Sequence, residues 1–142
     1  AERVNKVADY CGLDLVQLHG EESPAFCRKI NRRVIKAFRI KDLQSFKKLE
    51  KYSVSGFLLD TFSENLHGGT GKVFDWNLAH RAKKMGPIIL AGGLTPRNIC
   101  QALRQVRPYG VDVCSGVEKE PGIKDPEKVR AFLKNIRSGS KS

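Results

Sequence analysis

The chain has 142 residues, 40% of them apolar and 29% charged, which is typical of one globular domain with a sizeable core. No apolar run approaches the roughly 20 residues that a membrane-spanning helix needs, and no segment has the pattern of a secretory signal. We therefore expect a cytoplasmic protein with no membrane partner. The formal net charge of +11 is spread along the chain with few aromatic residues, which argues against a nucleic-acid partner. It favours either an anionic small-molecule ligand or a lysine-rich solvated surface.

The four cysteines are widely separated and form neither a CxxC pair nor a pattern with paired histidines. Such spacing argues against a disulfide framework and against a zinc site. Reduced thiols in a cytosolic protein fit the pattern better. We therefore expect no metal site.

Apolar periodicity alternates between helical and strand spacing along the whole chain. In chain order, the predicted elements are a helix ending at Gly12, a strand at 13–18, a helix opening at Ser23, a strand at 34–40, a helix opening at Asp42, a strand at 56–60, a loop at 61–72, a helix capped by Asp75, a strand at 87–91, a helix opening at Thr95, a strand at 111–113 and a helix opening at Asp125. A polar tail at 138–142 is expected to be flexible.

An initial helix followed by strand–helix units predicts an α/β fold with a parallel sheet in a single domain spanning 1–142. Strands such as 57–59 and 88–90 are apolar at both parities, as in a sheet that is covered on both faces. An open doubly wound sheet and a closed barrel both fit this order. A complete (β/α)₈ barrel usually needs about 200 residues or more, so the chain is expected to be an incomplete barrel.

Polar residues at the carboxyl ends of the predicted strands are the candidates for function, because these ends converge in parallel α/β folds. Two glycine motifs follow the last two strands: Gly92-Gly93, and Ser115-Gly116 with a predicted helical turn at 117–120. Backbone N–H groups there are suited to cradling a phosphate, although tight turns alone also explain glycine. The other candidates are Gln17, His19, Lys36, Asp60, Asp112 and Cys114.

Asp60 ends a wholly apolar strand. Partial desolvation there favours the protonated carboxyl group that a general acid needs, while an N-cap or a loop ion pair explains it equally well. We expect Lys36 to lie in the barrel interior or mouth and to pair with Asp60 or Asp112. His19 fits a substrate ligand or, more readily, a hydrogen-bonded structural histidine. The loop 61–72 is a candidate mobile lid or, almost as readily, a solvated loop without a function, and Val73 rules out a P-loop there.

Five motifs together resemble the phosphoribosylanthranilate isomerase family of tryptophan biosynthesis, in the family's own order. They are Val16–Gly20, Leu58–Thr61, Gly68–Lys72, Leu90–Leu94 and Val111–Glu118. The resemblance implies strands four to eight of a (β/α)₈ barrel and an Amadori rearrangement of a phosphorylated aminoaldose to its aminoketose. It matches Asp60 to the general acid and Gly92, Gly93, Ser115 and Gly116 to the phosphate cradle, and it implies no cofactor.

Two departures from the family pattern affect the expected activity. The family's general base is a cysteine in a Lys-Ile-Cys-Gly type motif on the first strand, and this sequence contains no such motif. Cys114 stands where the family usually has serine, so it is a remote candidate for a substitute base. We therefore expect the chain alone to be inactive. An alternative function is a phosphate-binding partial barrel that closes by self-association or with a complementing N-terminal segment.

Overall fold

The computed structural model describes residues 1–40, 42–60 and 76–139. Strands are β1 (Leu15–Leu18), β2 (Arg33–Arg39), β3 (Gly56–Asp60), β4 (Ile88–Ala91), β5 (Gly110–Val111), β6 (Glu118–Glu120) and β7 (Ile123–Lys124). The α-helices are α1 (Glu2–Tyr10), α2 (Pro24–Cys27), α3 (Leu43–Lys47), α4 (Trp76–Ala82), α5 (Ile99–Val106) and α6 (Pro126–Gly139), and the 3₁₀ turns are η1 (Leu49–Lys51), η2 (Lys83–Met85) and η3 (Ser115–Val117). The predicted alternation of helices with the first five strands is confirmed.

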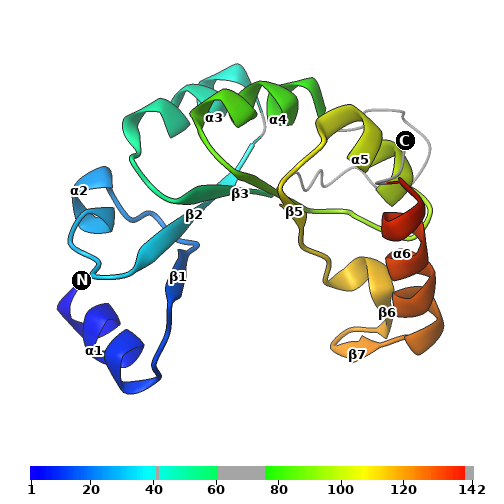
Figure 1. Cartoon of the computed structure of the whole chain (residues 1–142), viewed down its shortest axis with the longest axis horizontal. Helices are drawn as coiled ribbons and strands as arrows, with labels where there is room; N and C mark the ends of the chain where they lie inside the picture. Colours follow the sequence, from blue (N-terminus) through cyan, green and yellow to red (C-terminus); the bar gives the residue numbers. More distant parts are fainter. Residues whose placement is uncertain (41, 61–75, 140–142) are drawn as a thin grey trace.

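The main sheet pairs its five strands in chain order, β1-β2-β3-β4-β5, and every pairing is parallel. This confirms the predicted α/β class with a parallel sheet. The sheet is curved, with the helices outside it, and its concave face has no described helix over it (Figure 1). Because neighbouring strands run the same way, their carboxyl ends lie along one edge.

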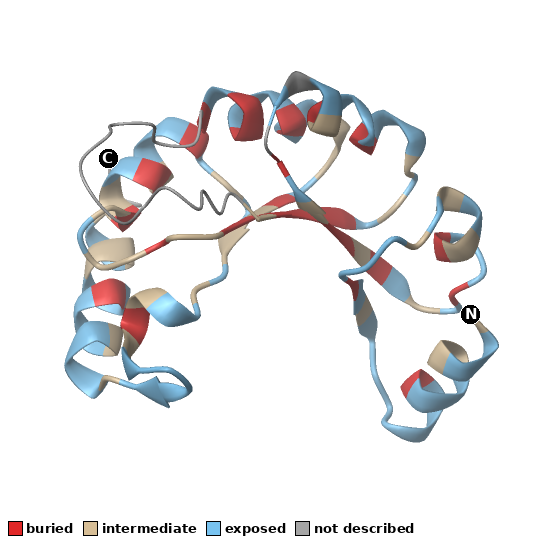
Figure 2. Ribbon diagram, turned by 180° about the vertical axis from the view of Figure 1, so that it is seen from behind, coloured by how far each residue is buried: buried red, intermediate tan, exposed pale blue. Residues whose placement is uncertain are grey.

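Each face of the sheet carries its own apolar cluster, as the strands with apolar residues at both parities predicted. The larger cluster lies between the sheet and the helices and includes Leu59, Leu90 and Ile99, all fully buried. A smaller cluster on the concave face contains Ala37, Leu58 and Ala91. Figure 2 shows the buried residues concentrated along the strands and the helix faces turned toward them. Alternation along a strand therefore decides which residues point to the helices and which to the concave side.

Three of the predicted helix starts are confirmed by side-chain hydrogen bonds, and one start is displaced. Asp125 Oδ1 accepts from the backbone N–H groups of Glu127 and Lys128 at the start of α6. The hydroxyl of Ser23 accepts from the backbone N–H of Phe26, and Asp42 forms a capping box with Ser45. Helix α5 begins at Ile99 rather than directly after Thr95. The Oδ1 atom of Asn98 accepts from the backbone N–H of Thr95 at 2.8 Å, which holds the preceding segment as a turn.

The segment after β5 also departs from the sequence prediction. The helical turn expected at 117–120 begins two residues earlier, at η3. Strand β6 (Glu118–Glu120) follows it and pairs antiparallel with β7 (Ile123–Lys124). Gly122, with φ +82°, makes the tight turn between these strands possible. The cross-strand pair between Lys124 Nζ and Glu118 Oε1, at 2.7 Å, stabilises the hairpin.

Two predicted segments and one predicted helix cap lie wholly or partly outside the residues that the structure describes. Helix α6 continues to Gly139, so the helix includes the first two residues of the predicted tail at 138–142. The predicted lid at 61–72 and the predicted cap Asp75 lie outside the described residues. None of the helices that the structure describes is both long and apolar enough to cross a bilayer.

Lys36 lies on the helix side of β2, so its predicted position in the barrel interior or mouth is wrong. Its side chain is 2% exposed and shares the strand face of Val34 and Phe38, and its Nζ atom lies 5.0 Å from the centre of the Phe38 ring. The ammonium group donates to the backbone carbonyls of Gly20, at 2.8 Å, and Ala37, at 2.9 Å.

The carboxylate partner of Lys36 is Glu22, not Asp60 or Asp112, with 3.3 Å between Nζ and Oε2. Burial by itself raises the pKa of Glu22. Hydrogen bonds from backbone N–H groups and from Lys36, together with the lysine charge, outweigh burial and hold this pKa below its ordinary value of 4.5. The pair fixes the segment after β1 to the middle of β2.

Replacing Glu22 by glutamine should lower the free energy of unfolding at pH 7 by about 1–3 kcal/mol, since Lys36 loses its counter-charge in a buried site. The lowered folded-state pKa means that the wild-type advantage is fully present above pH 4.5 and is lost as pH falls through the lowered value. Denaturant midpoints at pH 7 and at about pH 3 measure the difference.

Glu21→Gln is the matched control, because Glu21 is exposed and forms no ion pair within the part of the chain that the structure describes. Its stability should follow the wild-type pH profile. A Glu22→Gln variant that keeps the wild-type stability at both pH values would contradict the proposed strength of the Lys36 pair.

Candidate functional site

A cavity of about 360 Å³ opens at the carboxyl ends of the five parallel strands. Every one of these strands or the loop after it contributes to its wall. The lining residues are His19, Arg39, Leu58, Asp60, Ala91, Gly92, Gly93, Leu94, Asp112, Val113, Cys114, Ser115 and Gly116. The predicted convergence of polar strand ends is thus confirmed for most of the candidates.

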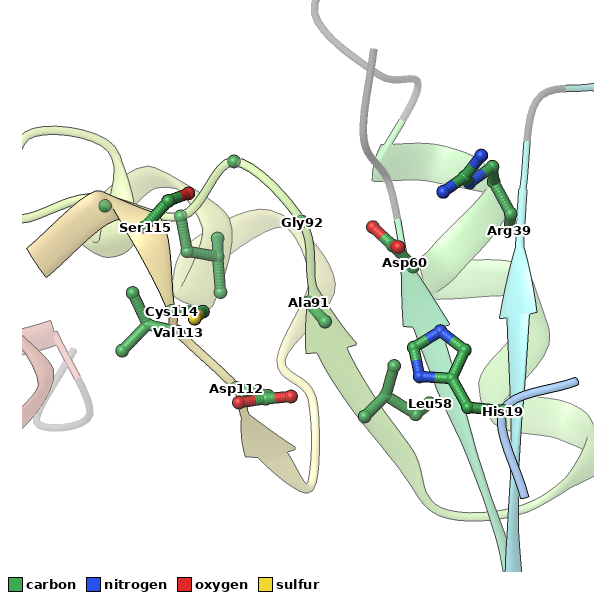
Figure 3. A pocket seen from close by; sticks show the side chains of 13 residues that line it. His19, Arg39, Leu58, Asp60, Ala91, Gly92, Asp112, Val113, Cys114 and Ser115 are labelled. Atoms are coloured by element: carbon green, nitrogen blue, oxygen red, sulfur yellow. The ribbon is translucent and has the colours of Figure 1, made fainter. Parts of the chain in front are cut away.

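Asp60 stands at the middle of this wall. It has the same parity as Leu58, which belongs to the concave-face cluster, so its carboxyl group faces the cavity and is partly buried. In the sheet register Asp60 lies beside Arg39 on β2 and beside Ala91 on β4. Figure 3 shows Arg39 and His19 on one side of Asp60, and Gly92 and Ser115 on the other.

The glycine pair after β4 has a backbone shape that other residues rarely adopt. Gly92 has φ +81° and Gly93 has φ +62°, both in the left-handed range. The side chain of Asn98 donates from Nδ2 to the carbonyl of Gly93 at 2.9 Å. This bond ties the turn to the start of α5, so the glycine pair is held in a fixed loop.

Gly116 is glycine for a steric reason that the sequence did not reveal. A Cβ atom at this position would overlap the carbonyl oxygen of Leu94 and come within 2.8 Å of the carbonyl carbon. The loops after β4 and β5 therefore touch backbone to backbone. This contact brings the Gly92-Gly93 turn and the Ser115–Val117 turn to the same end of the cavity.

Cys114 lines the cavity but also contacts the neighbouring hairpin. Its Sγ atom lies 3.4 Å from Lys124 Nζ and 3.6 Å from Glu118 Oε1. Lys124 additionally donates to the backbone carbonyl of Cys114 at 2.9 Å. The hydrogen bond from Lys124 holds the pKa of Glu118 below its ordinary value. Cys114 is thus fixed beside a cation and a carboxylate at the rim.

Two predicted candidates lie elsewhere, and one functional candidate was missed. Gln17 is exposed on β1 and is not among the residues that line the cavity, and Lys36 lies in the helix layer. Arg39 was not predicted. It ends β2 with the same parity as Ile35 and Ala37 of the concave cluster, which places it in the cavity wall; the pattern of β2 alone does not show which parity faces the cavity.

A second cavity, of about 280 Å³, adjoins the first. His19 and Arg39 line both cavities, while Lys36, Lys48 and Tyr52 line only the second. Among the described residues there is no group of three or more histidine, cysteine or carboxylate side chains arranged to hold a metal ion.

Comparison with known proteins gives a consistent set of relatives. The family model for N-(5'-phosphoribosyl)anthranilate isomerase matches residues 1–135. The N-(5'-phosphoribosyl)anthranilate isomerase of Geotalea uraniireducens is 60% identical over 134 residues, which cover 94% of this chain and 66% of that protein. Across eight such curated relatives the chain spans 63–67% of their length.

Solved structures agree with the sequence comparison. The phosphoribosyl anthranilate isomerase of Thermotoga maritima superposes with a TM-score of 0.81 at 40% identity, over 96% of this chain and 68% of that one. Another matches with a TM-score of 0.78 at 37% identity, over 96% of this chain and 66% of that one. It is in complex with reduced 1-(o-carboxyphenylamino)-1-deoxyribulose 5-phosphate. By sequence and by fold, this chain belongs to the N-(5'-phosphoribosyl)anthranilate isomerase family.

Proposed function

We propose that the protein containing this chain converts N-(5'-phosphoribosyl)anthranilate to 1-(2-carboxyphenylamino)-1-deoxyribulose 5-phosphate, a step of tryptophan biosynthesis. The observation that carries the proposal is the position of Asp60, a partly buried acid in the cavity wall with a pair of glycine loops to one side. The 60% identity to a curated isomerase over 94% of the chain supports the same reaction.

Asp60 acts as the general acid of the first step. It donates a proton to the ring oxygen of the ribose, the bond from that oxygen to C1 breaks, and the nitrogen lone pair forms a C1–N double bond. A base then removes the proton from C2, which gives an enolamine, and protonation at C1 with loss of the C2 hydroxyl proton completes the ketone. Because substrate and product are isomers, no external oxidant or reductant is needed. A positioned acid of this kind contributes about 10²–10⁴ in rate.

The two touching loops form the phosphate cradle. Gly92 and Gly93 have no Cβ atom to obstruct an anion, and the loop with Ser115 and Gly116 lies against the loop after β4 at Leu94. Backbone N–H groups from two loops at the end of a parallel barrel are a common phosphate site. The phosphorylated ligand of a solved relative supports this assignment.

The five strands correspond, in this proposal, to strands four to eight of an eight-stranded barrel. Outer strands β1 and β5 each have one main-sheet neighbour, and the concave face bears the apolar cluster of Ala37, Leu58 and Ala91. Three further strand–helix units would cover that face and pair with both edges. The 63–67% coverage of the relatives' lengths supports this reading. The base would come from those units.

Asp60→Asn tests the acid role in the full-length protein. The amide keeps the shape of the side chain but has no proton to transfer, so kcat should fall by about 10²–10⁴. Substrate affinity should change far less, because the proton is transferred only in the transition state. Steady-state kinetics of product formation measure both.

Asp14→Asn provides the control, because Asp14 is exposed and precedes β1 at the opposite end of the sheet. It should leave both constants unchanged. A kcat for Asp60→Asn within about threefold of wild type would exclude the acid role, while a wild-type protein without turnover would exclude the proposed reaction.

Gly116→Ala tests the phosphate cradle. The added methyl group must push the loop after β5 away from Leu94, so binding of a phosphate-bearing product analogue should weaken by about tenfold or more. The free energy of unfolding should also fall by about 1–3 kcal/mol. Gly122→Ala is the control, since Gly122 has open space around it and only its φ of +82° is strained. That variant should lose stability but keep phosphate affinity. Wild-type affinity in a folded Gly116→Ala protein would contradict the cradle.

Residues 1–142 by themselves should associate, because the outer edges of β1 and β5 and the concave face can pair with other chains. Sedimentation velocity should show species heavier than the 15.9 kDa chain. Adding a polypeptide that carries the complementary units should convert them to a one-to-one complex. A stable monomer that ignores this polypeptide would count against the barrel assignment.

A further inference from the structure

We propose that Lys36 and Glu22 are positioning residues for His19. From the helix side of the sheet their ion pair holds the backbone on both sides of His19, and so sets where the imidazole stands in the cavity that Asp60 lines. This inference rests on the proposed function and deepens it, because neither member of the pair lines that cavity.

Strand geometry turns His19 and Lys36 to opposite faces of the sheet. Leu18 lies beside Lys36 in the register of β1 and β2, and both side chains are buried. His19 is the next residue and has the opposite parity, and it lines the cavity together with Leu58 and Asp60 (Figure 3). Lys36 therefore reaches the backbone of His19 from behind, while the imidazole points to the cavity.

The ion pair holds both of the peptide groups that adjoin His19. Lys36 Nζ lies 3.4 Å from the carbonyl oxygen of Leu18, in the peptide before His19. A carboxylate oxygen of Glu22 accepts from the backbone N–H of Gly20 at 2.9 Å, in the peptide after it. The ammonium group also donates to the carbonyl of Gly20 at 2.8 Å. Because peptide groups are planar, holding the two that flank a residue fixes its φ and ψ, and with them the direction of its side chain.

The pair is itself fixed by the side chains around it. The ring of Phe38 lies 5.0 Å from Lys36 Nζ, and Tyr52 packs edge-on against that ring with 5.0 Å between the ring centroids. The Tyr52 hydroxyl donates to the backbone carbonyl of Glu22 at 3.0 Å. These contacts tie both members of the pair to β2 and to the residue after η1, so the pair has a defined place in the helix layer.

The imidazole ring of His19 is not held by contacts of its own. The residue is exposed, and no group in the part of the chain that the structure describes forms a hydrogen bond or an ion pair with the ring. The position of the ring therefore depends on the backbone at residue 19, which the Lys36–Glu22 pair holds.

The test replaces the ion pair by a neutral pair of similar shape in the full-length protein. Lys36→Met/Glu22→Gln keeps the net charge and leaves no unpaired charge buried, so its urea midpoint should lie closer to wild type than that of Lys36→Met alone. The ammonium bonds to the carbonyls around His19 are lost. The value of kcat/KM should fall about tenfold to a hundredfold, since a displacement of about 1 Å in a site can cost this much.

A double-mutant cycle with His19→Ala separates positioning from stability. His19→Ala should lower kcat/KM at least as much as replacing the pair does. Because the pair acts through His19, adding Lys36→Met/Glu22→Gln to His19→Ala should change kcat/KM by no more than about twofold. A role in stability alone would lower kcat/KM by the same factor with and without His19.

NMR signals of the imidazole report its position without any turnover. In Lys36→Met/Glu22→Gln the ring signals of His19 should shift or broaden. Those of His80, which is exposed on α4 and lines neither cavity, should stay as in wild type. Lys6→Met/Glu2→Gln is the matched control, because this ion pair is exposed on α1. It should leave kcat/KM and the His19 signals unchanged.

Three results would overturn the positioning role while leaving the proposed function intact. They are unchanged His19 signals in the Lys36→Met/Glu22→Gln variant, wild-type kcat/KM in His19→Ala, and equal losses from replacing the pair with and without His19. A wild-type protein without turnover would overturn the proposed function, and the NMR comparison would then still decide whether the pair positions His19.

Discussion

Parallel pairing of five strands in chain order is the constraint on which the site depends. Each connection carries the chain back to the end of the sheet at which the previous strand began. The carboxyl ends of all five strands therefore lie at one end of the sheet. Residues as distant as His19 and Gly116 come to line one cavity without any direct attraction between them. Covering one face with helices then leaves alternate residues of each strand on the concave side, where Asp60 stands.

Backbone contacts, rather than side-chain ion pairs, fix the shape of the cavity at the end formed by the loops after β4 and β5. The carbonyl of Leu94 lies where a side chain at position 116 would have to be, and Asn98 holds the carbonyl of Gly93. Such contacts do not weaken when salt screens surface charges. The opposite end, with exposed Arg39 and His19, depends on charge and on longer side chains. The cavity thus has a rigid end and a more adjustable one.

Local signals predicted the elements well where the cause of the structure was itself local. Ser23 caps its helix with its own hydroxyl group, and an apolar run followed by an acid defined β3 and placed Asp60 at its end. The hairpin after β5 was missed because a run of charged residues, Glu118 to Glu120, carries little strand signal. The ion pair between Lys124 and Glu118 stabilises the hairpin across its two strands. A contact of this kind cannot be predicted from the residues of either strand taken alone.

On β2 the sequence predicted Lys36 as the basic residue of the cavity, whereas the structure places Arg39 there. The cause is again a contact between segments. A strand that is apolar on both faces gives no contrast between inside and outside, so its pattern fixes the alternation but not which set faces the cavity. Neighbouring strands and helices decide it: Val34 packs with Cys27 and Ile30 toward the helices, which commits Lys36 to that layer. A lysine there needs a partner, and Glu22 supplies it. Three positions further, the opposite parity leaves Arg39 facing the cavity beside Asp60.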